Sequence, residues 1–182
     1  SEKRYQFADL TNGISEKQQL DFHSPYGCSK GVADQYVRDY SRIYKLNTVV
    51  VRQSCIYGIN QLGIEDQGWV AWFTIAAMMG KEISIYGDGK QTRSFMYIDD
   101  CIIGTKKLFF SNFSEPLNIG SEEQVSINEM IEIIENLADI QLKKKFLLEK
   151  PLGVRGRSSN NDLARNKINW DTTVSLKEGL SK

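Results

Sequence analysis

The chain has 182 residues, 41% of them hydrophobic and 25% charged, a composition typical of a soluble globular protein of about one domain. Lysine plus arginine equals aspartate plus glutamate at 23 each, so no net charge draws the chain to nucleic acid or to an anionic membrane. No apolar run approaches the roughly 20 residues of a membrane span, and the single histidine argues against a multi-histidine metal site.

Residues 1–23 are polar and lack a clear period, which predicts a surface loop. A helix is predicted over 25–44, with Ser24 as its N-cap and Pro25 at its first position. This helix carries Tyr26 and Lys30, whose spacing of four residues places both side chains on one face. A lysine ammonium favours the phenolate form of a neighbouring tyrosine, so the pair suits general acid/base chemistry between a carbinol and a carbonyl. The plain alternative is a pair on a solvated helix face.

A short β-branched run at 47–52 predicts a buried strand of a parallel sheet. Residues 55–58 then leave this strand at its carboxyl end, where such sheets bind ligands. The segment 68–79 is apolar nearly all round and predicts a mostly buried helix. Trp69 and Trp72, within it, are interpreted as core aromatics rather than as a platform for stacking bases.

The second half of the chain predicts further alternating strands and helices. Two strands at 83–86 and 93–97 are expected to be joined by the turn 87–90, which makes an exposed hairpin arginine the plain alternative for Arg93. Asp99 and Asp100 begin a helix where acidic residues suit its dipole. The remaining predictions are a helix to residue 110, a strand at 116–119, a helix to 138 with a Ser126–Glu129 capping box, a strand at 145–148, a loop to 161 and two short helices at 163–167 and 175–180.

The three cysteines lie far apart and form no C-x-x-C pair, which argues against a zinc site or a disulfide framework. Cys28, Cys55 and Cys101 are therefore interpreted as reduced, partly buried thiols of a cytoplasmic protein.

Several motifs together resemble one family, the extended short-chain dehydrogenase/reductases that act as NAD-dependent nucleotide-sugar epimerases and dehydratases. They are P-Y-G-C-S-K-G at 25–31, D-Q-G-W at 66–69, T-R-S-F at 92–95, N-I-G-S at 118–121 and G-V-R-G-R at 153–157. The first two are most similar to CDP-tyvelose (CDP-paratose) 2-epimerases, and the last three to GDP-mannose 3,5-epimerases. The chain departs from the second group in having no lysine over 59–72, and from the first group in its R-S-F-M segment at 93–96.

The resemblance implies a role for each candidate residue. Tyr26 would exchange a proton with a sugar hydroxyl while NAD exchanges a hydride with the same carbon, and Lys30 would bind the nicotinamide ribose. The residues implied to contact the cofactor are Tyr26, Lys30 and Tyr57. The residues implied to contact the nucleotide-diphosphate sugar are Arg93, Arg157 and Gln67. Asp66 has an equally good interpretation as a helix cap, and Arg155 is a weaker anion-binding candidate.

A dinucleotide-binding domain needs a glycine-rich turn after its first strand, and no G-x-G-x-x-G sequence occurs here. We therefore expect an α/β fold: the C-terminal part of a doubly wound, Rossmann-type domain plus a small α/β substrate-binding lobe, with the N-terminal glycine-rich half absent. Residues 1–80 are expected to complete the NAD-binding domain, and residues 81–182 to form mainly the nucleotide-sugar lobe, with interleaved segments.

The functional prediction is a NAD-dependent nucleotide-sugar epimerase that oxidises a sugar carbon transiently. The alternatives are a 4,6-dehydratase and a non-catalytic nucleotide-sugar-binding fragment. We expect a homodimer for the full-length protein, no metal, and no activity from the isolated chain.

Overall fold

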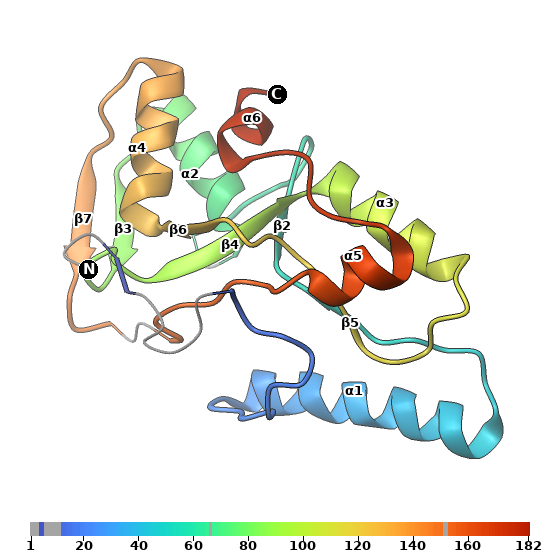
Figure 1. The fold of residues 1–182 in the computed structure, drawn as a ribbon. Coiled ribbons are helices and arrows are strands. Elements are labelled where there is room, and N and C mark those ends of the chain that lie inside the picture. Colours follow the sequence, from blue (N-terminus) through green and yellow to red (C-terminus); the bar gives the residue numbers. More distant parts are fainter. Residues whose placement is uncertain (1–3, 6–11, 66, 151–152) are drawn as a thin grey trace.

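The computed structural model describes residues 4–5, 12–65, 67–150 and 153–182 (Figure 1). Helices and strands alternate along the chain, as expected for an α/β fold. The helices are α1 (Pro25–Tyr44), α2 (Trp69–Met78), α3 (Ile98–Phe109), α4 (Ile127–Ala138), α5 (Asp162–Ile168) and α6 (Leu176–Ser181). The strands are β1 (Val51–Gln53), β2 (Cys55–Tyr57), β3 (Ile83–Tyr86), β4 (Thr92–Tyr97), β5 (Leu117–Ile119), β6 (Gln124–Ser126) and β7 (Lys144–Leu147).

The strands pair mainly in parallel. β1 pairs with β5, β2 with β4 and β3 with β7 in parallel, while β6 lies antiparallel to β4. Only Ser54 separates β1 from β2, so one continuous stretch of chain pairs first with β5 and then with β4. The Ser54 hydroxyl accepts a hydrogen bond from the Ser121 N–H at 3.0 Å, which holds the chain after β5 beside this change of partner.

Most predicted elements are confirmed, and three strand predictions are wrong in detail. The predicted strand 47–52 is confirmed only at its end, in β1. Residues 55–57, predicted to leave the sheet, instead form β2 because β4 offers them a new partner. β3 and β4 form no hairpin, since each pairs with strands distant in the sequence. β6, which was not predicted, supplies the other edge of β4.

The predicted ranges 1–80 and 81–182 are interleaved in the sheet. β1 and β2 come from the first range, yet their partners β5 and β4 come from the second. The division into a cofactor part and a substrate part stays a prediction.

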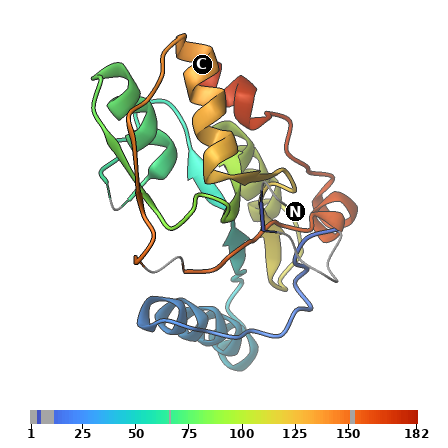
Figure 2. The same ribbon diagram turned by 90° about the vertical axis from the view of Figure 1, so that its left-hand side faces the viewer.

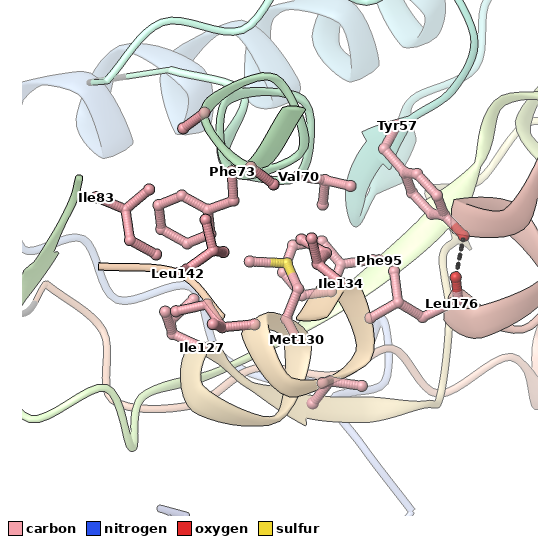
Figure 3. Close-up of a cluster of buried hydrophobic side chains, with 14 of the residues drawn as sticks. Tyr57, Val70, Phe73, Ile83, Phe95, Ile127, Met130, Ile134, Leu142 and Leu176 are labelled. Atoms are coloured by element: carbon pink, nitrogen blue, oxygen red, sulfur yellow. Dashed lines mark hydrogen bonds between the residues drawn. The ribbon is translucent and has the colours of Figure 1, made fainter. Parts of the chain in front are cut away.

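Two clusters of buried apolar side chains form the core. The first lies between α2, α4, β3 and β4 and includes Phe73, Ile83 and Met130 (Figure 3). The second lies between β5, α3 and α5. β4 contributes to both, because Phe95 and Tyr97 enter the first cluster and Met96 enters the second. This central strand is therefore buried on both faces, as expected in a sheet covered by helices.

Helix α1 lies apart from both clusters, along one side of the molecule (Figures 1 and 2). Its only buried residue is Gly31. An apolar stripe along this helix is largely exposed, with Tyr36 at 63%, Tyr40 at 51% and Tyr44 at 62% relative exposure. Local signals thus form the helix, while contacts to the rest of the described chain are few.

Within the described ranges, none of the helices has both the length and the apolar character that crossing a membrane requires.

Candidate active site

Tyr26 and Lys30 share one face of α1, as their spacing predicts. The Lys30 Nζ lies over the Tyr26 ring, 5.4 Å from its centroid. Both side chains are exposed, Tyr26 at 72%. The pair is therefore formed within the helix itself and remains open to a ligand.

The first turn of α1 is fixed by its cap and by the loop before it. Ser24 caps the helix, its hydroxyl accepting a hydrogen bond from the Gly27 N–H at 3.0 Å, and Pro25 occupies the first position as predicted. The Phe22 ring folds back onto Gly31, where a Cβ would lie only 2.0 Å from the ring. Glycine leaves the space that this packing needs.

Two side-chain contacts set the direction of α1 relative to β1. Arg52 Nε donates to the Asp34 carboxylate at 2.8 Å, and Thr48 Oγ1 donates to the Val37 carbonyl at 3.4 Å. Val37, later in α1 than Asp34, contacts Thr48, which precedes Arg52 in the chain. Helix α1 therefore runs antiparallel to the segment 48–52. The start of α1, with its Tyr–Lys pair, consequently lies toward the carboxyl end of β1. Open α/β sheets bind ligands at that end.

Arg93, the second residue of β4, is only 9% exposed. The alternative interpretation of Arg93 as an exposed hairpin residue is therefore wrong, because β4 lies between β2 and β6. Arg93 Nη1 donates to the carbonyls of Thr92 at 2.8 Å and Val154 at 2.6 Å. Burial lowers the pKa of the Arg93 guanidinium and the charge of Arg157 lowers it further, while Cys55 raises it. Within the described ranges no carboxylate pairs with Arg93, and a buried cation of this kind is costly unless an anion joins it.

The segment 153–157 brings Arg157 beside Arg93. The Thr92 N–H donates to the Arg155 carbonyl at 2.8 Å, and the Thr92 carbonyl accepts the Arg157 N–H at 3.3 Å. Cys55 is exposed at the surface, but desolvation by the surrounding protein raises the pKa of its thiol, and the positive charges of Arg93 and Arg157 partly oppose that shift. Arg93, Arg157 and Cys55 thus form an electropositive group, named here the arginine cluster. Cys55 begins β2 two residues after β1 ends, so the cluster lies just beyond the carboxyl end of β1, the end toward which the Tyr–Lys pair lies.

Tyr57 is buried in the core. Its side chain is 4% exposed, and its hydroxyl donates to the Ser175 and Leu176 carbonyls, each at 3.3 Å. Its ring packs edge-on against Tyr97 at a centroid distance of 5.5 Å. The Tyr57 side chain therefore joins α6 to the core (Figure 3), and its predicted cofactor contact stays a prediction.

Gln67 lies in a tight loop before α2, and its side chain is exposed. Its N–H and carbonyl both bond to Ile64, at 3.0 and 2.9 Å. The predicted substrate contact of Gln67 stays a prediction. Asp66 lies outside the described residues, and the N-cap of α2 is Gly68.

Two features of the site were missed in the sequence. Trp69, predicted as a core aromatic, packs against the first cluster but also faces the Arg93 guanidinium, 5.5 Å from the ring centroid. Cys55, interpreted only as a reduced thiol, belongs to the arginine cluster. The only signal for this part of the site in the sequence is that Arg93 stands two residues before the apolar run 95–97. The pairing of β4 is needed to see that this arginine is buried beside Trp69 and Cys55.

These features define an α/β protein of the Rossmann type with a Tyr-x-x-x-Lys helix and an electropositive arginine cluster. The chain belongs to the NAD dependent epimerase/dehydratase family, whose model matches residues 6–120. The resemblance drawn from the motifs is thereby confirmed.

Two sequence relatives and one solved structure illustrate the relationship. The chain is 39% identical over 196 residues to the CDP-paratose 2-epimerase of Salmonella typhi, with 100% of this chain and 57% of that protein covered. It is 35% identical over 181 residues to the GDP-mannose 3,5-epimerase 1 of Oryza sativa subsp. indica, with 96% of this chain and 48% of that protein covered. The crystal structure of the UDP-glucuronic acid 4-epimerase of Bacillus cereus, in complex with UDP-glucuronic acid and NAD, matches with a TM-score of 0.85 at 30% identity. That match covers 92% of this chain and 54% of the other, so the chain spans about half the length of its relatives.

Proposed function

We propose that this chain carries the catalytic pair and the substrate-binding arginines of a NAD-dependent nucleotide-sugar epimerase, which oxidises a sugar carbon transiently. One observation carries the proposal: the Tyr26–Lys30 pair and the arginine cluster both lie toward the carboxyl end of β1. The Tyr–Lys pair suits proton transfer and the arginine cluster suits the binding of a diphosphate. Together they suit a substrate in which a sugar is attached to a nucleoside diphosphate.

In this mechanism Tyr26 accepts the proton of the reacting sugar hydroxyl and later returns it. The Lys30 ammonium, over the Tyr26 ring, stabilises the phenolate that forms. When bound, NAD supplies the acceptance and the return of a hydride. The exposure of both side chains leaves room for the sugar and the cofactor together.

The described residues fit one end of NAD. Lys30 offers three N–H donors to ribose hydroxyls beside the Tyr26 phenol. The pyrophosphate needs a glycine-rich turn at a strand-to-helix junction, which this sequence does not contain. We propose that residues 1–80 supply the nicotinamide side of the cofactor site and residues 81–182 most of the substrate lobe. The isolated chain would then neither bind NAD tightly nor turn over substrate.

The proposed substrate is a nucleotide-diphosphate sugar. A planar guanidinium donates two parallel hydrogen bonds to phosphate oxygens, which suits Arg93 and Arg157 to the diphosphate. Gln67, in the exposed loop before α2, is proposed to contact the sugar. We further propose a homodimer, supported by the exposed apolar stripe of α1, and a cytoplasmic location, supported by three cysteines without a disulfide.

The dehydratase alternative retains the same Tyr–Lys pair, and the description of the matched family model includes both activities. A dehydratase needs additional acid/base carboxylates near the tyrosine. Product analysis separates the two, because an epimerase product keeps the mass of its substrate whereas a dehydratase product has lost one water.

The test is Tyr26→Phe in a protein that joins this chain to the glycine-rich half of the fold. Loss of the acid/base group should lower turnover by about 100- to 10,000-fold and leave nucleotide-sugar affinity within a few-fold. Tyr36→Phe is the matched control, since Tyr36 is another exposed tyrosine of α1, at 63% exposure. A Tyr26→Phe enzyme that turns over as fast as the Tyr36→Phe control would remove Tyr26 from the mechanism. If the parent protein and both variants lack activity, the result favours the non-catalytic alternative.

A further inference from the structure

Trp69 contacts Arg93, which is the buried cation of the site. Its ring lies 5.5 Å from the Arg93 guanidinium carbon, a separation at which the face of an indole attracts a cation. Arg93 is 9% exposed, so water screens this attraction only weakly. The contact joins the first residue of α2 to the second residue of β4.

The backbone around Trp69 is firmly held. Gly68 caps α2 in the left-handed conformation, with φ of 74°, and its carbonyl accepts the Trp72 N–H at 2.8 Å. Gly63 packs so closely that a Cβ there would lie 2.3 Å from the Trp72 nitrogen. The ring of Trp69 packs against the first core cluster. An indole supported in this way has a defined position, and it can define the position of its partner.

The remaining contacts of Arg93 leave part of its guanidinium available. Nη1 donates to two main-chain carbonyls, those of Thr92 and Val154. Within the described ranges, neither Nε nor Nη2 of Arg93 has a hydrogen-bond partner. Nε–H and one Nη2–H together form the fork that binds two phosphate oxygens.

We propose that Trp69 is a positioning residue that holds the Arg93 guanidinium so that Nε and Nη2 meet the diphosphate of the substrate. The indole restrains the guanidinium from one side, and the two carbonyls restrain it at Nη1. This inference rests on the proposed function, in which Arg93 binds that diphosphate. The Trp69 side chain therefore contributes to anion binding as well as to packing of the core.

The experiment measures the binding of inorganic pyrophosphate to the chain by calorimetry. Arg93→Ala should weaken binding by about 10-fold or more, since a charge-assisted hydrogen bond is lost. Trp69→Leu should weaken it by about 5- to 30-fold, the strength of a partly desolvated cation–π contact, whereas Trp69→Phe keeps an aromatic face and should stay within about 3-fold of the parent. In the Arg93→Ala background, Trp69→Leu should have no further effect. Where Trp69→Leu does not fold, Trp69→Met takes its place as the non-aromatic variant.

The outcomes separate the inference from the proposed function. If Arg93→Ala binds pyrophosphate like the parent, or the parent does not bind it, the proposed anion site fails and the inference with it. If Arg93→Ala weakens binding while the non-aromatic and Phe variants bind equally well, the proposed function stands and the positioning role of Trp69 is overturned. Equal weakening by Trp69→Leu in both backgrounds also overturns it, because a purely structural role does not depend on Arg93.

Discussion

Asp100→Asn should destabilise the protein although the two side chains have nearly the same shape. Asp100 is the third residue of α3 and is 1% exposed. Its carboxylate accepts the N–H groups of Thr173 and Val174, both at 3.0 Å, and the Thr173 hydroxyl at 2.7 Å. Its main-chain carbonyl accepts the Trp170 indole N–H at 3.1 Å. This one residue therefore ties the segment before α6 to α3.

The magnitude follows from the loss of charge. An asparagine can still form three hydrogen bonds here, with the Thr173 hydroxyl turned to accept, but none of them is charge-assisted. A hydrogen bond to a charged group contributes about 1.5 to 3 kcal/mol and a neutral one about 1, so the variant should lose roughly 2 to 3 kcal/mol. For a chain of this size, that loss corresponds to a fall in Tm of roughly 5 to 10 °C.

Urea unfolding, followed by tryptophan fluorescence and circular dichroism, measures the change. Asp99→Asn is the matched control, because Asp99 is exposed and lies in the same first turn of α3. It removes the same charge from the helix dipole and should cost at most about 1 kcal/mol. Equal free energies of unfolding for the two variants would show that the Asp100 contacts contribute nothing beyond the dipole.

Two further predictions concern groups with shifted pKa values. Burial raises the pKa of Tyr57 far above its usual range, and the nearby Glu123, Tyr97, Asp100 and Glu178 raise it further. The stability that comes from the neutral form of Tyr57 is therefore complete below about pH 10 and declines as the pH rises above that value. Tyr57→Phe should lose about 1 to 2 kcal/mol at neutral pH and show a shallower decline of unfolding free energy above pH 10; an unchanged slope would contradict this. Desolvation raises the pKa of Cys55 and the Arg93 charge opposes the shift, so Arg93→Gln should raise that pKa further and slow the alkylation of Cys55 by iodoacetamide at pH 8. Exposed Cys28 is the internal control and should react at an unchanged rate, while buried Cys101 should react only on unfolding; an unaltered Cys55 rate would place Arg93 outside the cluster.

The elements that the sequence predicts well are those decided by neighbouring residues. Helix α1 has the predicted bounds because Ser24 and Pro25 signal its start without help from the rest of the chain. The capping box of Ser126 and Glu129 is confirmed for the same reason, with both of its hydrogen bonds formed. The Tyr26–Lys30 pair also depends only on helical spacing, so its geometry could be predicted from the sequence.

The features that the sequence could not supply depend on residues far apart along the chain. β3 and β4 flank a glycine-rich turn typical of a hairpin, yet their partners lie elsewhere in the chain. That pairing decides that Arg93 is buried. Asp100 suits the dipole of α3 as predicted, but its buried hydrogen bonds reach more than seventy residues ahead. Spacing and composition contain no direct signal for either contact.

The two chemical parts of the site are joined by one short stretch of chain. Residues 51–57 lie against α1 through Arg52, then change partner at Ser54 and enter the arginine cluster at Cys55. The Tyr–Lys pair depends on α1, whereas the arginine cluster depends on β4 and on segment 153–157. Because no element carries both parts, substitutions in α1 should alter proton transfer without altering anion affinity, and substitutions around Arg93 should do the reverse. The position of the Tyr–Lys pair relative to the arginine cluster therefore depends on the path of the chain around Ser54, which lies in neither part.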